Sequence, residues 1–185
     1  MKTESKQFLL KIARKSLENY FRGKGKLKVD ESNAPAETNK LGATFVTLTK
    51  DGELRGCIGS LIAKKKIYED VINNSLNAAF SDHRFPQLAE SELNEIKIEI
   101  SVLGEAKHMQ IKSPKTFLEE IERNKPGLIL QVGMNQATYL PQVWEDLPEP
   151  NEFMSTLSQK AGLLADAWAR PDAEIFTYNV DDIQE

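Results

Sequence analysis

The sequence predicts an α+β fold with mainly antiparallel strands. Two pairs of short, β-branched stretches flank turns, which is typical of β-hairpins. Amphipathic helical stretches are interspersed among them without the regular strand-helix alternation that a doubly wound parallel sheet requires. With 185 residues, of which 40% are hydrophobic, the chain is long enough to form its own core, and we expect a single domain over residues 1–185.

In the first half of the chain, apolar residues at helical spacing predict a surface helix over residues 5–21. Residues 22–40 contain glycines, a proline and small polar residues, and are expected to form a flexible loop. The basic run in this loop fits either an arm that touches phosphate or a solvated linker. Residues 42–48 and 54–58 predict a hairpin that turns at Asp51-Gly52, with Cys57 at or just beyond the end of its second strand.

The second half continues the mixture of helices and strands. A strict alternation of apolar and polar side chains over residues 95–103 predicts a strand with one wet face. The remaining expected elements are helices over 68–80, 114–121 and 152–162, a second hairpin of 127–133 and 137–140, a proline-broken loop over 140–148, and a terminal strand over 174–180.

Composition excludes several functional classes. The 24 Lys and Arg against 28 Asp and Glu give a formal charge of -4, which argues against a general affinity for nucleic acid. One cysteine and two histidines leave neither an internal disulfide nor a Cys/His zinc cluster, so we predict no metal and no cofactor. No segment approaches the roughly 18 apolar residues of a membrane span. We therefore expect a cytoplasmic protein without a membrane segment.

A candidate site centres on the stretch Asp51–Ser60, which holds the single cysteine between two glycines. Since glycine lacks a Cβ, Gly56 and Gly59 let a ligand or a second backbone approach closely. An exposed Cys57, two residues after Arg55, would have its thiolate favoured by the positive charge. The alternative is that Cys57 is a small buried hydrophobic residue in a tightly packed strand end.

Further candidates follow in Asp82-His83-Arg84-Phe85. Arg55 and Arg84, with Asp82, could form a binding groove for a carboxylate, a phosphate or an acidic peptide, because guanidinium groups suit planar anions. Alternatively, one or both arginines pair with local carboxylates such as Asp82. A catalytic hypothesis makes Cys57 the nucleophile, His83 the base and Asp82 or another carboxylate the group that orients the imidazole.

Five blocks in this order resemble a known family: Gly42–Leu48, Leu54–Gly59, Asp82–Phe85, Leu140–Val143 and Lys160–Leu163. The chain resembles the AMMECR-one domain family, called AmmeMemoRadiSam system protein A in prokaryotes, from about Phe8 to Val180. The six residues from Leu54 to Gly59, LRGCIG, look like the family signature. The resemblance implies a compact α+β fold of two unequal lobes, with this motif near the groove between them.

The resemblance also implies two functional partners, a Memo-like protein and a radical SAM protein. This chain has no C-x-x-x-C-x-x-C motif and so is not the radical enzyme itself. We expect a binding or adaptor-type module that recognises an anionic ligand or a protein partner in a cleft between the lobes, lined by Arg55, Cys57 and Arg84. The alternative is a cysteine-dependent enzyme, for group transfer or hydrolysis, that uses Cys57.

Overall fold

The computed structural model describes residues 1–185, and the chain forms two compact units. Unit 1 comprises Met1–Leu103 together with Asp181–Glu185, and unit 2 comprises Gly104–Val180. Each unit has its own hydrophobic core and its own four-stranded sheet. The strands pair mainly antiparallel, which confirms the predicted α+β class.

The sheet of unit 1 has the strand order β10-β5-β2-β3, so β3 lies at one edge. The sheet is built by β2 (Thr44–Lys50), β3 (Glu53–Gly59), β5 (Ile96–Leu103) and β10 (Val180–Gln184). Strands β2 and β3 form the expected hairpin, with Asp51 and Gly52 both at positive φ in its turn. The last residues of the chain thus complete a sheet that begins near residue 44.

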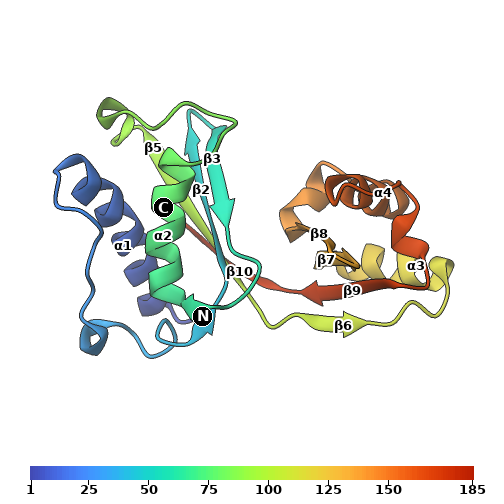
Figure 1. Ribbon diagram of the computed structural model, residues 1–185. Coiled ribbons are helices and arrows are strands. Elements are labelled where there is room, and N and C mark those ends of the chain that lie inside the picture. Colours follow the sequence, from blue (N-terminus) through green and yellow to red (C-terminus); the bar gives the residue numbers. More distant parts are fainter. The chain divides into compact units, whose positions relative to one another are not determined.

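One face of this sheet is covered by α1 (Thr3–Phe21) and α2 (Ile67–Phe80), which lie side by side in Figure 1. Alternate residues of β2 and β5 point toward these helices, because successive strand side chains face opposite ways. The buried cluster includes Leu9, Leu17, Val46, Leu48, Val71, Ile98 and Ile100. Four short elements complete the unit: η1 (Glu31–Asn33), η2 (Glu90–Glu92), and β1 (Leu41–Gly42) paired with β4 (Lys65–Lys66).

Unit 2 is built around a sheet with the order β6-β9-β7-β8. Its strands are β6 (Lys107–Met109), β7 (Gly127–Val132), β8 (Asn135–Tyr139) and β9 (Ala173–Tyr178). Its helices are α3 (Pro114–Asn124), η3 (Pro141–Glu145), α4 (Pro150–Lys160) and η4 (Ala167–Ala169). Aromatic side chains fill much of its core: the rings of Trp144 and Phe153 stack with centroids 3.9 Å apart.

The structure confirms the predicted helices and both hairpins and corrects three details. Cys57 lies inside β3, which continues to Gly59, and not at the end of the strand. Residues 141–145 form a 3-10 helix where a proline-broken loop was expected, because Pro141 occupies a first-turn position that needs no N–H donor. The short strands β1, β4, β6 and β10 were not predicted. No helix of the protein has both the length and the apolar character needed to span a bilayer.

Candidate functional site

Cys57 lies on the face of the unit 1 sheet opposite α1 and α2. Its register partner is Thr47, which alternates along β2 with the core residues Val46 and Leu48. The Thr47 hydroxyl donates a hydrogen bond to Cys57 Sγ at 3.2 Å. Cys57 as a whole residue is half-buried.

The main-chain groups of Cys57 are bound by side chains from the segment that follows α2. The Cys57 N–H donates to Asp82 Oδ2 at 2.8 Å, and Arg84 Nη2 donates to the Cys57 carbonyl at 3.2 Å. Since β3 is an edge strand, these side chains take the place of a neighbouring strand and satisfy exposed polar backbone groups. The predicted site residues Cys57, Asp82 and Arg84 therefore come together, through the backbone of Cys57.

Asp82 and Arg84 also pair with each other. Arg84 Nη2 lies 2.7 Å from Asp82 Oδ2, and Arg84 Nε donates to Asp82 Oδ1 at 3.0 Å. These bonds hold the pKa of Asp82 well below its usual range, although desolvation acts in the opposite direction. The Asp82 side chain is only 4% exposed, whereas that of Arg84 is 58% exposed. The pair thus hides its carboxylate and presents its guanidinium.

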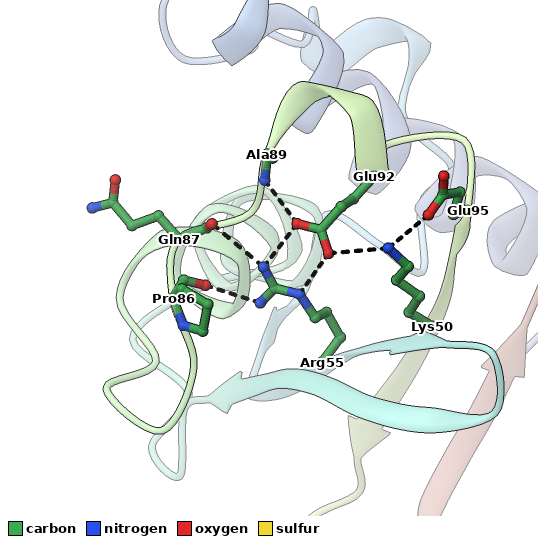
Figure 2. A network of polar contacts seen from close by, with 7 residues as sticks. All are labelled: Lys50, Arg55, Pro86, Gln87, Ala89, Glu92 and Glu95. Atoms are coloured by element: carbon green, nitrogen blue, oxygen red, sulfur yellow. Dashed lines mark hydrogen bonds and ion pairs between the residues drawn. The ribbon is translucent and has the colours of Figure 1, made fainter.

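Arg55 has a different environment, shown in Figure 2. Its Nε and Nη2 atoms each lie 2.9 Å from a carboxylate oxygen of Glu92, so the pair is bidentate. Its Nη1 and Nη2 donate to the carbonyls of Pro86 and Gln87. With 13% of its side chain exposed, Arg55 fastens β3 to the segment 86–92. This arrangement matches the alternative that an arginine of the motif pairs with a local carboxylate.

Glu92 is the centre of this network. It accepts hydrogen bonds from Arg55 and from the backbone N–H of Ala89, and these bonds lower its pKa to about 2 against the opposing effect of burial. Lys50 approaches the same carboxylate at 3.5 Å and also contacts Glu95 at 2.6 Å. Sequence reasoning missed Glu92, and its position in a polar stretch gave no signal that could have found it.

The two glycines of the motif are required by packing within unit 1. A Cβ placed on Gly56 would lie 2.2 Å from the carbonyl oxygen of Ala78 in α2, so the strand and helix backbones touch there. A Cβ on Gly59 would lie 2.2 Å from Cγ of Phe45, its register partner on β2. Both glycines thus allow the close approach that was predicted, and in each case the approaching group is part of the protein.

His83 is exposed and makes no hydrogen bond or ion pair. The Cys57–His83 contact that the catalytic hypothesis needs is therefore not formed. No group of three or more His, Cys, Asp and Glu side chains is arranged to hold a metal ion.

A second polar cluster was not predicted. Asp70 of α2 is 3% exposed and accepts hydrogen bonds from the backbone N–H and the hydroxyl of Thr44, at 2.9 and 2.8 Å, and from Ser60 Oγ at 2.8 Å. Asn74 donates to Asp70 and to the Thr44 carbonyl. These bonds tie α2 to the start of β2 and to the end of β3. A signal existed, because Asp70 and Asn74 are spaced i, i+4 beside the apolar stripe.

Together, the fold and the site define a two-unit α+β domain whose LRGCIG strand is clamped at its edge by an Asp-Arg pair. The AMMECR1 family model matches residues 10–183, and the chain belongs to the AMMECR1 family. A protein from Methanopyrus kandleri is 37% identical over 190 residues, which cover 98% of this chain and 89% of that protein. One from Nanoarchaeum equitans is 35% identical, with 92% and 94% covered.

Solved structures contain the same fold. The crystal structure of an uncharacterized protein from Pyrococcus horikoshii matches with a TM-score of 0.88 at 28% sequence identity. The match covers 100% of this chain and 93% of that protein. The fold is thus shared with an experimentally determined structure.

Proposed function

We propose that this chain is a cytoplasmic binding or adaptor-type domain that recognises an anionic group at Arg84, beside Cys57. The anionic group belongs to a small ligand or to an acidic residue of a protein partner. The protein partners that the family resemblance implies are a Memo-like protein and a radical SAM protein. The observation that carries it is the pairing of a buried Asp82 carboxylate with an exposed Arg84 guanidinium.

Pre-organisation supports this proposal. Asp82 holds Nε and Nη2 of Arg84, and the Phe85 ring lies 5.5 Å from its guanidinium carbon, so little side-chain freedom remains to be lost on binding. Nη1 makes no hydrogen bond within the protein, and a guanidinium edge of this kind suits a carboxylate or phosphate oxygen. Arg55 acts indirectly, because its donors are engaged by Glu92 and two carbonyls and hold the strand in place.

The test is an NMR titration of the isotope-labelled full chain with pyrophosphate and, separately, with a hexaglutamate peptide. We expect saturable shifts of the Cys57 and Arg84 resonances with at least one of the two probes. Arg84→Gln should abolish the saturable binding of the probe. Arg84→Lys should weaken this binding, because lysine keeps the charge but lacks the planar guanidinium group that binds an anion through two N–H donors. An absence of saturable shifts at these residues in the wild type contradicts the proposal.

Arg170 supplies the matched control. Its Nε and Nη2 atoms lie 2.9 and 2.8 Å from the two carboxylate oxygens of Asp172, and its side chain is 53% exposed. Asp172, however, is 57% exposed, so this pair presents both charges to solvent. Arg170→Gln should therefore leave the titration unchanged. An equal loss in Arg84→Gln and Arg170→Gln would mean that only net charge matters.

The cysteine enzyme remains the second candidate, since Cys57 is half-buried and is not a fully buried core residue. The variant Cys57→Ala distinguishes the binding function from the enzymatic one. Asp82 and Arg84 contact the backbone of Cys57, so this variant should keep probe binding within about threefold, a difference below ~1 kcal/mol. Loss of binding together with covalent capture of a thiol-reactive ester by the wild type would favour the enzyme.

A further inference from the structure

A hollow of about 300 Å³ lies on unit 1 beside α1, and none of its lining residues belongs to the LRGCIG motif. Four side chains give it an apolar lining, Phe8, Ile12, Leu27 and Val29. Leu27 and Val29 belong to the segment after α1 and are partly buried against the unit 1 core. The segment alternates these apolar residues with exposed lysines, so its two faces have opposite character.

Three lysines line the same hollow, Lys11 and Lys15 from α1 and Lys28 from the segment. None of them makes an ion pair, although other lysines of the unit do, such as Lys50 with Glu95. No carboxylate lines the hollow. We name it the lysine hollow and define it by these three lysines and the four apolar residues.

The spacing of the lysines is unfavourable for the isolated chain. Lys11 and Lys15 are i, i+4 on α1, where like charges repel and destabilise a helix. The nearest acidic residue on this helix face, Glu18, lies 4.0 Å from Arg22 instead. A bound anion would relieve this repulsion, and the apolar lining would hold an apolar group attached to that anion.

The adjoining hollow on the α2 side provides a contrast within the same unit. It shares Leu27, Lys28 and Val29 with the lysine hollow, but its lining also contains Lys26 and the carboxylate of Glu69. Glu69 already accepts a hydrogen bond from the backbone N–H of Lys66. The α2-side hollow therefore combines positive and negative side chains, and it has no comparable preference for an anion. Of the two hollows, only the lysine hollow is lined by lysines without any carboxylate.

We infer that the lysine hollow binds a small amphiphilic anion, a phosphate or carboxylate group joined to an apolar chain or ring. The volume lies at the lower end of small-molecule sites, which are about 300–1,000 Å³. This site is separate in sequence and in lining residues from Arg84 and Cys57, so it adds a second ligand to the proposed function and does not depend on it.

The test compares three probes on the full chain by calorimetry and NMR: octyl phosphate, octanol and inorganic phosphate. Octyl phosphate should bind saturably, with shifts confined to residues 8–15 and 27–29. Octanol and inorganic phosphate should each bind at least about tenfold more weakly, because each lacks one of the two complementary parts. Added salt should weaken the binding of octyl phosphate.

Two double variants with the same change in charge separate the hollow from general electrostatics. Lys11→Gln/Lys15→Gln should weaken octyl phosphate binding about tenfold or more. Lys64→Gln/Lys65→Gln removes two exposed lysines outside the hollow and should have no such effect. All four side chains are exposed, so both variants should fold, which their NMR spectra would verify.

Several outcomes would overturn the inference. Equal weakening in the two double variants would show that binding follows net charge. Octanol binding as tightly as octyl phosphate would show that the lysines have no role. An absence of saturation, or shifts at other residues, would exclude the site. Binding of an acidic amphipathic peptide with all three small probes inert would replace the small-ligand assignment with a protein-binding face.

Discussion

The carboxylate of Asp82 accepts a hydrogen bond from the main-chain N–H of Cys57 at 2.8 Å, so the lone cysteine is held through its backbone. The side chain of the cysteine contacts Thr47 instead. Asp82 is 25 residues away in the chain and directly follows Ser81, the C-cap residue of α2. This bond explains how the segment Asp82–Phe85 and the LRGCIG strand act as one structural feature.

Replacing Asp82 should show how much the Cys57 backbone depends on its hydrogen bond to this carboxylate. Asp82→Ala leaves the Cys57 N–H without its acceptor and Arg84 without its partner, which should cost about 2–3 kcal/mol. Hydrogen exchange of the Cys57 amide should become markedly faster. Asp172→Ala, which breaks a similar but exposed pair, should cost less than about 1 kcal/mol. An unchanged exchange rate at Cys57 would mean that the bond is not formed in solution.

Arg55 and Glu92 should show strong energetic coupling. Arg55→Ala removes the bidentate partner of the largely buried Glu92 carboxylate, which then keeps only Lys50 at 3.5 Å and the Ala89 N–H, and we expect a loss of about 2–4 kcal/mol in urea unfolding. A double-mutant cycle with Glu92→Ala should return a coupling of about 1–3 kcal/mol. Arg55→Lys should recover little of it, because lysine lacks the bidentate fork. The exposed pair of Arg22 and Glu18, at 4.0 Å, is the control and should couple by less than about 0.5 kcal/mol.

Acid should weaken unit 1 through Glu92. Its folded pKa of about 2 is below its ordinary value of 4.5, so the folded state binds its proton less readily than the unfolded state. The resulting stability, on the order of 2 kcal/mol, is fully present above pH 4.5 and is lost as the pH falls toward 2. Glu92→Gln should therefore flatten the dependence of unfolding free energy on pH in this window. Glu90→Gln, which removes an exposed carboxyl that makes no side-chain bond, is the matched control for the loss of one carboxyl group.

Gly56 should not tolerate a methyl group. In Gly56→Ala the new Cβ would meet the Ala78 carbonyl at 2.2 Å, and moving a helix backbone is costly, so we expect a loss of about 2–4 kcal/mol. Gly104→Ala, whose nearest atom lies at 3.1 Å, should cost less. Thermal and urea unfolding of both variants would check this order. The opposite order would show that β3 can move away from α2 at little cost.

Sequence patterns predicted what depends on short-range order. Periodic apolar residues placed α1, α2 and β5, and the Asp51-Gly52 turn placed the hairpin that carries Cys57, because both signals depend on neighbours a few residues apart. The same reasoning found Gly56 and Gly59 as positions of close approach. It missed β10 and β6, which are short and depend on pairing with distant strands.

The roles of the two motif arginines could not be read from the chain, because each role depends on which carboxylate the fold brings near. Glu92 is 37 residues from Arg55 and takes up its donors, whereas Asp82 leaves Arg84 exposed. The sequence by itself determined the helices, the hairpins and the location of the LRGCIG strand. Only the tertiary structure decided that one arginine fastens this strand and the other faces solvent, because burial and charge pairing arise from contacts between distant segments.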